Sequence, residues 1–467
     1  MSNSLTKIAA LFFFSQISIV AAAQIRGNYA AIYSGTPWVD QNGKTVSAHA
    51  ANIIKDKGKY YLFGEAHTDT SNAFVGFNCY SSPDLYNWRF ESMALPQQKS
   101  GKLGPNRVGE RPKVLRCPKT GEYIMLMHCD TMGYTDQYIG YATANSITGP
   151  YTFHGPLLFK GAPIKKWDMG SFQDRDGSGY LLVHGGNIFK LSDDYKSVTE
   201  QVLKDLAPDC ESPALFRKGN IYFQLMSNKT SWERNDNYYY TAASLKGPWT
   251  SRGLLAPKGM LTWNSQTTFV LPIEGTKDTT YMFMGDRWAY PRQASSATYV
   301  WQPLTISGTS LSMPKYLEAW QVDLKTGLVS APVGTTKIID HGDTKTIAYS
   351  GPWLKGTGAA CSDMKGDYFR ADFTGKQVAI YGVSRPDGGY ARITIQNDQA
   401  KTVLTALIDM YSMYTVNSLN FISPVMSKGR YTLTVTVVGE HGNWTDKRKN
   451  LFGSKGNFVS LDKLVVQ

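Results

Sequence analysis

The chain has 467 residues, of which 42% are apolar and 13% aromatic, and this composition excludes an intrinsically disordered protein. Its formal net charge is +12, but the basic residues are dispersed without a Lys/Arg run, so nucleic-acid binding is not expected. The charge fits a basic soluble surface or a surface that attracts an acidic polysaccharide.

The first 23 residues are predicted to form a secretory signal peptide. Lys7 supplies a positive charge near the start, residues 8–20 form an apolar core, and the alanines at 21–23 fit a small-residue cleavage site. The apolar run is too short to span a bilayer comfortably, and no second long run follows it, so no membrane insertion is expected. We therefore expect an exported protein, periplasmic or secreted, that begins at Gln24 after cleavage.

One sequence pattern then occurs five times. Each copy begins with a polar residue and continues with a short apolar strand, a polar or glycine turn, and an aromatic-rich strand. Further strand-like segments follow, about four strands per copy, and helical periodicity is nearly absent. A strand-only repeat is typical of a β-propeller in which each copy forms one blade, so we predict five blades over residues 24–333. The polar residues that begin the copies are His49, Glu110, Asp168, Glu211 and Gln266.

The fifth blade is expected to be completed near residues 298–308 or by N-terminal residues near 29–39. From about Lys337 the pattern changes to alternating strands separated by Gly and Asp turns, without a helix signal. This change predicts a jelly-roll-like β-sandwich over residues 334–467 and an all-β fold for the whole chain. The second module either binds carbohydrate or braces the propeller.

The five cysteines are an odd number without CxxC spacing, which argues against a zinc site and against a disulfide framework. Most lie in strand-like segments and are expected to pack as small apolar groups, although one disulfide stays open. They are Cys79, Cys117, Cys129, Cys210 and Cys361.

Three of the five copies begin with a carboxylic acid: Glu110, Asp168 and Glu211. Since the first strand of each propeller blade lines the central axis, these side chains should converge at one end of it. Carboxylates that lie close together raise one another's pKa, which can keep one of them protonated near neutral pH. Glycoside hydrolysis needs such an acid and a second group that activates water. The repeat therefore predicts a site for this chemistry.

The motifs resemble glycoside hydrolase family 43, a family of inverting enzymes with five-bladed propellers. Asp168, in WDMGSFQDRDGSGY, matches the aspartate that tunes the acid, and Glu211, in CESPALF, matches the general acid. The first copy departs from the family because SAHAANII lacks the base aspartate. The segments AHAANII, YYLFGEA, GERPKV, SNKTSWERN, WNSQTTF and MGDRW resemble the exo-β-1,3-galactanase branch, which places a glutamine near the attacking water; Gln266 matches it. The resemblance covers roughly residues 29–329.

The same resemblance implies substrate-binding roles. Glu110 and Arg111 would hold hydroxyls of the terminal galactose, and three further residues would reach the same pocket: Glu65, Tyr134 and Thr230. Three tryptophans lie next to motif residues and either stack on a sugar or belong to the core: Trp232, Trp263 and Trp288.

Handling of the water is an open point of the prediction. A neutral amide is a very poor proton acceptor, so Gln266 would position the water through its carbonyl or relay a proton as the imidic acid. Glu110 is the alternative base. His49 has a second interpretation, because some family members hold an ion or waters near an axial histidine, but no acidic calcium loop is present and no metal is predicted.

Together the residues and the resemblance predict an exported, exo-acting, inverting glycoside hydrolase that releases galactose from the non-reducing end of β-1,3-galactan, the arabinogalactan backbone. Another family 43 activity, such as an arabinofuranosidase or xylosidase, is the first alternative, and a non-catalytic sugar-binding propeller is the second. The expected partner is a polysaccharide or oligosaccharide substrate. We expect a monomer without a cofactor.

Overall fold

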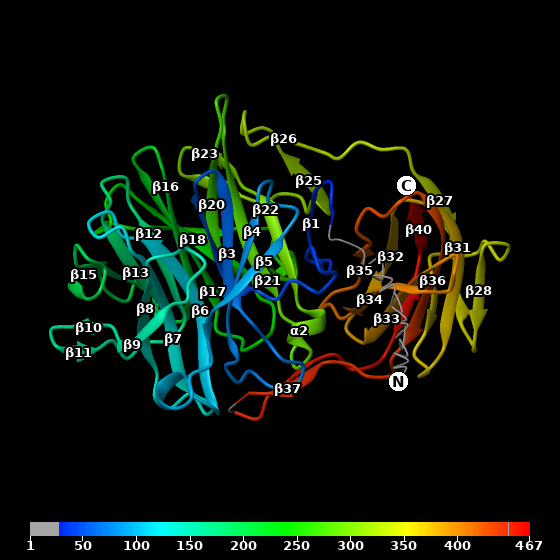
Figure 1. Ribbon diagram of the computed structural model, residues 1–467, viewed down its shortest axis with the longest axis horizontal. Helices are drawn as coiled ribbons and strands as arrows, with labels where there is room; N and C mark the ends of the chain where they lie inside the picture. The colour runs from blue at the N-terminus through cyan, green and yellow to red at the C-terminus, as the bar shows by residue number, and fades with distance from the viewer. Residues whose placement is uncertain (1–27, 447) are drawn as a thin grey trace, which may run out of the picture.

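The computed structural model describes residues 28–446 and 448–467, and strands dominate it (Figure 1). The predicted signal peptide at residues 1–23 lies outside the described residues. Within the described ranges the helical segments are short: η1 (Gly101–Leu103), α1 (Leu261–Asn264) and α2 (Gln293–Ser296). None of them is long and apolar enough to cross a membrane. The predicted all-β class is confirmed.

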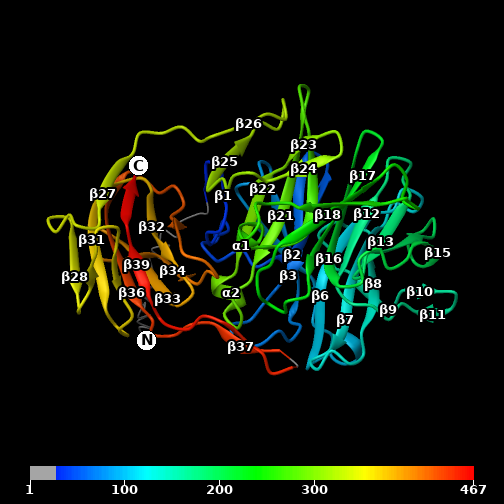
Figure 2. The ribbon, with the colours of Figure 1, turned by 180° about the vertical axis from the view of Figure 1, so that it is seen from behind.

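Five sheets, antiparallel except where β10 pairs with β15, make up most of the larger lobe (Figures 1 and 2). In each sheet the strands run outward from one inner strand, mostly in chain order. Each inner strand contacts the next, and the last contacts the first, so the five form a ring of contacts. The inner strands are β2 (His49–Asp56), β6 (Arg107–Arg116), β12 (Met169–Gln173), β16 (Cys210–Lys218) and β20 (Gln266–Glu274).

The outer strands complete the five sheets. They are β3 (Lys59–Glu65), β4 (Gly76–Ser82) and β5 (Arg89–Pro96); β7 (Tyr123–Thr131), β8 (Tyr138–Ala144) and β9 (Thr152–Pro156); β10 (Leu158–Phe159), β11 (Ala162–Pro163), β13 (Gly179–Val183), β14 (Asn187–Leu191) and β15 (Val198–Leu203); β17 (Ile221–Asn228), β18 (Asn237–Ala242) and β19 (Thr250–Leu254); and β21 (Thr279–Arg287) and β22 (Thr298–Pro303).

A separate apolar core fills the space between each pair of neighbouring sheets. Between the first two sheets, for example, Phe63 and Phe77 pack with Met125 and Met127. Both faces of each sheet are thus covered, which explains the apolar, aromatic-rich strands of the repeat. The inner strands approach very closely: a Cβ at Gly170 would lie 2.2 Å from a backbone oxygen of the next inner strand. All five cysteines lie in the described ranges, and they are free and mostly buried.

A backbone irregularity marks the start of the inner strands. A β-bulge follows the first polar residue of the copy in β2, β6, β16 and β20. Bulges bend a strand and redirect side chains, and they are common beside active sites. Non-glycine residues with positive φ occur at three of these bulges and just before β12, at a cost of order 1 kcal/mol each. They are Ala50 (49°), Arg111 (53°), Asp168 (37°) and Ser212 (54°).

Of the two predicted segments, residues 298–308 supply the third strand of the fifth sheet, and the N-terminal segment contacts this strand without belonging to the sheet. β22 is its third strand, and the N–H of Gly35 donates to the carbonyl of Tyr299 in β22 at 2.7 Å. The N-terminal residues also pair with later strands, in a small sheet of β1 (Ile32–Tyr33), β25 (Ala319–Val322) and β26 (Val329–Ser330). A short hairpin of β23 (Thr305–Ser307) and β24 (Ser310–Ser312) lies between.

Two sheets that share one apolar core form the smaller lobe, drawn yellow to red in Figure 1. In β31, buried and exposed residues alternate along the strand, so one face packs on this core. The first sheet contains β27 (Lys337–Asp340), β40 (Lys463–Val466), β32 (Val378–Ser384) and β35 (Val416–Ile422). The second contains β28 (Ile347–Ser350), β31 (Tyr368–Gly375), β36 (Gly429–Val437), β33 (Tyr390–Asn397) and β34 (Thr402–Asp409). Smaller pairings involve β29 (Leu354–Lys355), β30 (Ala360–Ser362) and β39 (Val459–Leu461), and β37 (Asn443–Thr445) with β38 (Leu451–Gly453).

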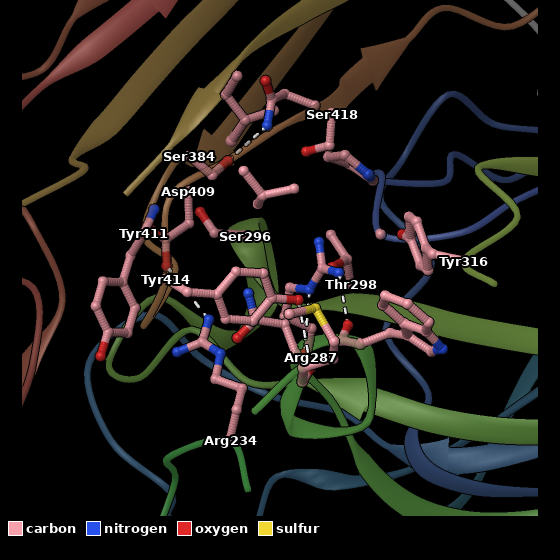
Figure 3. A pocket seen from close by; sticks show the side chains of 18 residues that line it. Arg234, Arg287, Ser296, Thr298, Tyr316, Ser384, Asp409, Tyr411, Tyr414 and Ser418 are labelled. Carbon is pink, nitrogen blue, oxygen red and sulfur yellow. Dashed lines mark hydrogen bonds and ion pairs between the residues drawn. The ribbon is translucent and has the colours of Figure 1, made fainter. Parts of the chain in front are cut away.

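Polar contacts join the two lobes around a small cavity of about 90 Å³ (Figure 3). Asn264, in the left-handed turn labelled α1, donates from Nδ2 to the hydroxyl of Ser412 at 2.6 Å. Arg234 lies 3.9 Å from the carboxylate of Asp409 at the end of β34. Burial raises the pKa of Asp409 to about 6, although Arg234 acts in the opposite direction. The smaller lobe therefore packs on the turn that leads into β20.

Candidate active site

Four of the five residues that begin the copies line one cavity of about 720 Å³: Glu110, Asp168, Glu211 and Gln266. The predicted convergence is therefore confirmed for these four. His49 is different, because it is fully buried and its Nδ1 lies 3.2 Å from the carboxylate of Asp286. It contributes to the wall behind the cavity and does not line it.

Arg111 is buried and connects several groups of the site. Its Nε lies 3.0 Å from Oδ1 of Asp168. Its Nη2 donates to Ser212 Oγ at 2.5 Å and to Gln266 Oε1 at 2.7 Å, and its backbone N–H donates to Glu65 Oε1 at 2.7 Å. Ser212 in turn donates to Asp168 Oδ2 at 2.7 Å. The guanidinium thus holds three side chains in fixed positions, and the backbone N–H holds Glu65.

The two acids Asp168 and Glu211 have opposite pKa shifts. Burial alone would raise the pKa of Asp168, but Arg111 and the hydroxyl of Ser212 bring it below the ordinary aspartate value. Burial and the negative charge of Asp168 hold the pKa of Glu211 well above the ordinary glutamate value, although Arg111 and Lys229 oppose them. The opposite shifts favour an ionised Asp168 beside a protonated Glu211, which is the combination that acid catalysis requires.

The side-chain amide of Gln266 is fixed by four hydrogen bonds. Its Oε1 accepts from Arg111 at 2.7 Å and from Trp288 Nε1 at 3.0 Å. Its Nε2 donates to Ser227 Oγ at 3.1 Å and to Glu211 Oε1 at 3.3 Å. Since Arg111 and Trp288 can only donate, the orientation of the amide is determined. The predicted use of the carbonyl to hold the water does not fit this arrangement, because both lone pairs of Oε1 are already used.

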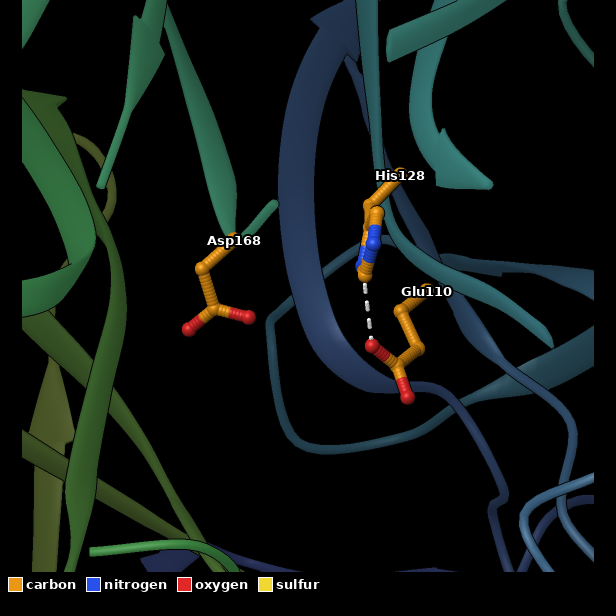
Figure 4. Close-up of side chains that lie close together, drawn as sticks. All are labelled: Glu110, His128 and Asp168. Carbon is orange, nitrogen blue, oxygen red and sulfur yellow. Dashed lines mark hydrogen bonds and ion pairs between the residues drawn. The ribbon is translucent and has the colours of Figure 1, made fainter. Parts of the chain in front are cut away.

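Glu110 lies beside a buried histidine (Figure 4). His128 Nδ1 is 3.0 Å from Glu110 Oε2, and His128 Nε2 is 3.3 Å from Asp130 Oδ2. Burial lowers the pKa of His128, but the two carboxylates outweigh burial and raise this pKa to about 9. The hydroxyl of Tyr134 donates to Glu110 Oε1 at 2.7 Å. Glu110 is thus held between an imidazolium and a phenol.

A group of metal-ligating residue types occurs here in the described part of the chain. Ligand atoms of Glu110, His128 and Asp168 lie within 4.8 Å of one another (Figure 4). Both ring nitrogens of His128 contact carboxylates, and Asp168 contacts Arg111. A cation would have to compete with the charges of Arg111 and of the protonated imidazole, so these residues suit an ion-pair network better than a metal.

The predicted substrate-binding residues all line the cavity: Glu65, Arg111, Tyr134, Thr230, Trp232 and Trp288. Trp288 is only 3% exposed, and its indole N–H holds Gln266. Trp263 does not belong to the site. Its Nε1 donates to the carbonyl of Met313 at 3.0 Å, and its ring lines the small cavity between the lobes. A sugar-stacking role for Trp263 is therefore wrong.

Sequence reasoning missed several polar residues that face the predicted site residues on the second strand of each sheet. In register, His128 faces Glu110, and Ser227, which accepts from Gln266, faces Glu211. Asp286 faces Gln266 but contacts His49 behind the cavity. The second strand of every copy ends at a polar residue, and this sequence signal could have located them. A second missed set comes from the smaller lobe and lines the same cavity: Trp444, Thr445, Asp446, Arg448 and Phe452.

Comparison with known proteins agrees with this geometry. The model of "Glycosyl hydrolases family 43" matches residues 44–252. An exo-β-1,3-galactanase variant from Phanerochaete chrysosporium, solved with β-1,3-galactotriose, has a TM-score of 0.69 and 27% identity, over 93% of this chain and 99% of that one. A candidate exo-β-1,3-galactanase from Bifidobacterium bifidum has a TM-score of 0.56 and 35% identity, over 60% of this chain and 95% of that one. No curated protein matches the chain. With this similarity and this site, the chain belongs to glycosyl hydrolases family 43 and is a glycoside hydrolase.

Proposed function

We propose that the protein is an exo-acting, inverting enzyme that releases galactose from the non-reducing end of β-1,3-galactan. The opposite pKa shifts of Glu211 and Asp168 carry this proposal, because they supply a protonated acid beside a permanent negative charge. The similar solved structures, described as exo-β-1,3-galactanases, support the substrate. An exo mode agrees with a cavity whose residues Glu65, Arg111 and Gln266 are at most 4% exposed.

We infer that the five sheets are the blades of a five-bladed β-propeller over residues 24–333. The ring of inner strands and the five cores between sheets support this arrangement. The two sheets of the smaller lobe would form a jelly-roll-like sandwich over residues 334–467, with the boundary between β26 and β27. Export to the periplasm or the medium rests on the signal sequence predicted at residues 1–23.

In the proposed mechanism Glu211 donates its proton to the glycosidic oxygen while the bond from this oxygen to C1 of the terminal galactose breaks. Asp168 keeps its charge and holds Glu211 in the protonated form until then. The amide N–H of Gln266 contacts Oε1 of Glu211, so the acidic hydroxyl is directed to the other oxygen. A water attacks C1 from the opposite face, and α-galactose is the first product.

Glu110 is the side chain that we propose as acceptor of the proton from this water. Its carboxylate accepts hydrogen bonds from Tyr134 and His128, and a carboxylate has about four acceptor positions. Gln266 has no acceptor position left, since Arg111 and Trp288 use both. We therefore assign Gln266 a positioning role and Glu110 the role of base.

Replacement of Glu211 by Gln tests the proposal. Glutamine keeps the shape but has no proton to give, so turnover of β-1,3-galactotriose should fall by about 10²–10⁴-fold. Binding of the trisaccharide, measured by calorimetry, should change only a few-fold. Glu274→Gln is the matched control, because Glu274 is an exposed residue at the far end of β20. Full turnover by Glu211→Gln would exclude Glu211 as the acid. Activity of the wild-type enzyme on arabinan or xylan, without activity on β-1,3-galactan, would favour another family 43 specificity.

A further inference from the structure

A hairpin of the smaller lobe forms part of the wall of the active-site cavity. β37 and β38 pair antiparallel, with Thr445 opposite Leu451, and the hairpin lies under the larger lobe, away from the two large sheets of its own (Figures 1 and 2). Residues of this hairpin and of its turn line the same cavity as Glu211. The five-fold repeat does not include this segment.

Specific contacts hold the hairpin against the larger lobe. The indole N–H of Trp444 donates to Ser231 Oγ at 3.3 Å, and its ring meets the ring of Tyr290 edge-on at 6.3 Å. The N–H of Gly453 donates to the buried carboxylate of Glu233 at 3.3 Å. The hairpin is therefore fixed at the cavity by both of its strands.

A row of aromatic rings leads from the catalytic amide to this hairpin. Trp288, which holds Gln266, meets Trp232 at 5.0 Å, and Trp232 stacks on Tyr290 at 5.8 Å with ring planes 4° apart. Trp444 continues the row and stacks on Phe452 at 5.9 Å. Trp288 and Trp444 are buried, whereas three rings are partly exposed at the cavity: Trp232, Tyr290 and Phe452. Partly exposed aromatic rings offer apolar surface to the faces of pyranose rings.

The turn of the hairpin adds polar groups at the open end of the cavity. Asp446 accepts from the backbone N–H groups of Arg448 and Asn450 at 2.8 and 2.9 Å, so its carboxylate fixes the turn. Arg448 itself is exposed and lines the cavity. An exposed guanidinium beside aromatic surface can donate to sugar hydroxyls.

We propose that the hairpin of β37 and β38, with its residues 443–446 and 448–453, forms a binding subsite for the sugar units on the leaving-group side of the scissile bond. This inference rests on the proposed exo function. The terminal galactose must enter the buried end beside Glu65 and Gln266, so the rest of the glycan leaves through the open end, where Arg448 and Phe452 lie. The smaller lobe is thus a part of the catalytic cleft and selects substrates by length.

Kinetics on substrates with different leaving groups test this subsite. The probes are p-nitrophenyl β-galactoside, β-1,3-galactobiose and β-1,3-galactotriose, and the variants are Trp444→Ala and Arg448→Ala. We expect kcat/KM for galactotriose to fall about tenfold, which corresponds to about 1.4 kcal/mol, with a smaller loss for galactobiose and less than about twofold for the aryl galactoside. Leu451→Ser is the control, since Leu451 belongs to the same hairpin, is 75% exposed and does not line the cavity.

Two results would overturn the subsite. An equal loss on all three substrates would mean that the hairpin only supports the catalytic pocket, and no loss on any of them would mean that it does not meet the glycan. Thermal unfolding identifies a variant that is merely destabilised; if Trp444→Ala is such a variant, Arg448→Ala on the exposed turn decides. If the wild type hydrolyses no β-galactoside, the proposed function fails, and calorimetry with galactotriose then decides separately whether the hairpin binds sugar.

Discussion

Single charges set the chemistry of this site. Burial beside the charge of Asp168 raises the pKa of Glu211, and contacts with Arg111 and Ser212 lower the pKa of Asp168. The repeat in the sequence predicted that both carboxyls converge on one site, and their roles as acid and tuning aspartate came from the family resemblance. It could not predict the contacts of Arg111, because these depend on the left-handed backbone at that residue and on four separate strands.

Asp168→Asn should shift the pH dependence of the reaction. Without the negative charge the pKa of Glu211 falls, so the acid loses its proton at a lower pH, and the alkaline limb of kcat/KM moves to lower pH. The measurement is kcat/KM for galactotriose across the pH range. Asp176→Asn, in an exposed turn of the same sheet, should leave the limb unchanged. A loss of rate with an unmoved alkaline limb would show that Asp168 does not tune Glu211.

Azide separates the roles of Glu110 and Gln266. Azide attacks without losing a proton, so it should restore part of the turnover of Glu110→Ala and yield galactosyl azide. Gln266→Ala should lower kcat by about 100-fold with little change in KM, because the hydrogen bond from the amide to Glu211, which orients the acid, is lost, and azide should not restore it. Rescue of Gln266→Ala alone would reverse the two assignments.

At the scale of elements, the bulges and the junction between the lobes position the site. A bulge at the start of an inner strand follows from no local propensity, although the polar residue that begins each copy marks its place. The hairpin β37–β38 was beyond prediction for a different reason. Trp444 contacts Ser231 across more than two hundred residues of sequence, and only tertiary packing brings such segments together.

The junction makes stability depend on pH. The pKa of Asp409 is raised to about 6 by burial, so its stabilising contribution is complete below about pH 4 and is lost as pH rises through 6. The melting temperature of the wild type should therefore fall between pH 5 and pH 7.5, and Asp409→Asn should reduce this fall. The effect is at most about 3 kcal/mol. Asp398→Asn, in an exposed turn, is the control; an identical fall in the Asp409 variant would contradict the assignment.

At the scale of the whole molecule, two lobes of different architecture share one cleft. Alternation of apolar and polar residues and the five-fold repeat predict the strands of both lobes, because these patterns are local. The way in which the lobes meet depends on long-range contacts such as Asn264 with Ser412, which no local pattern encodes. The sequence therefore predicted the catalytic end of the cleft and missed the wall that the smaller lobe supplies.

Product analysis of residues 24–467 on linear β-1,3-galactan tests the central claim most directly, with β-1,4-galactan and arabinan as controls. An exo-acting enzyme of the proposed specificity releases galactose as the sole product, and from the β-1,3-linked polymer only. Oligosaccharides as early products, or sugar released from arabinan in place of β-1,3-galactan, would contradict the proposed function.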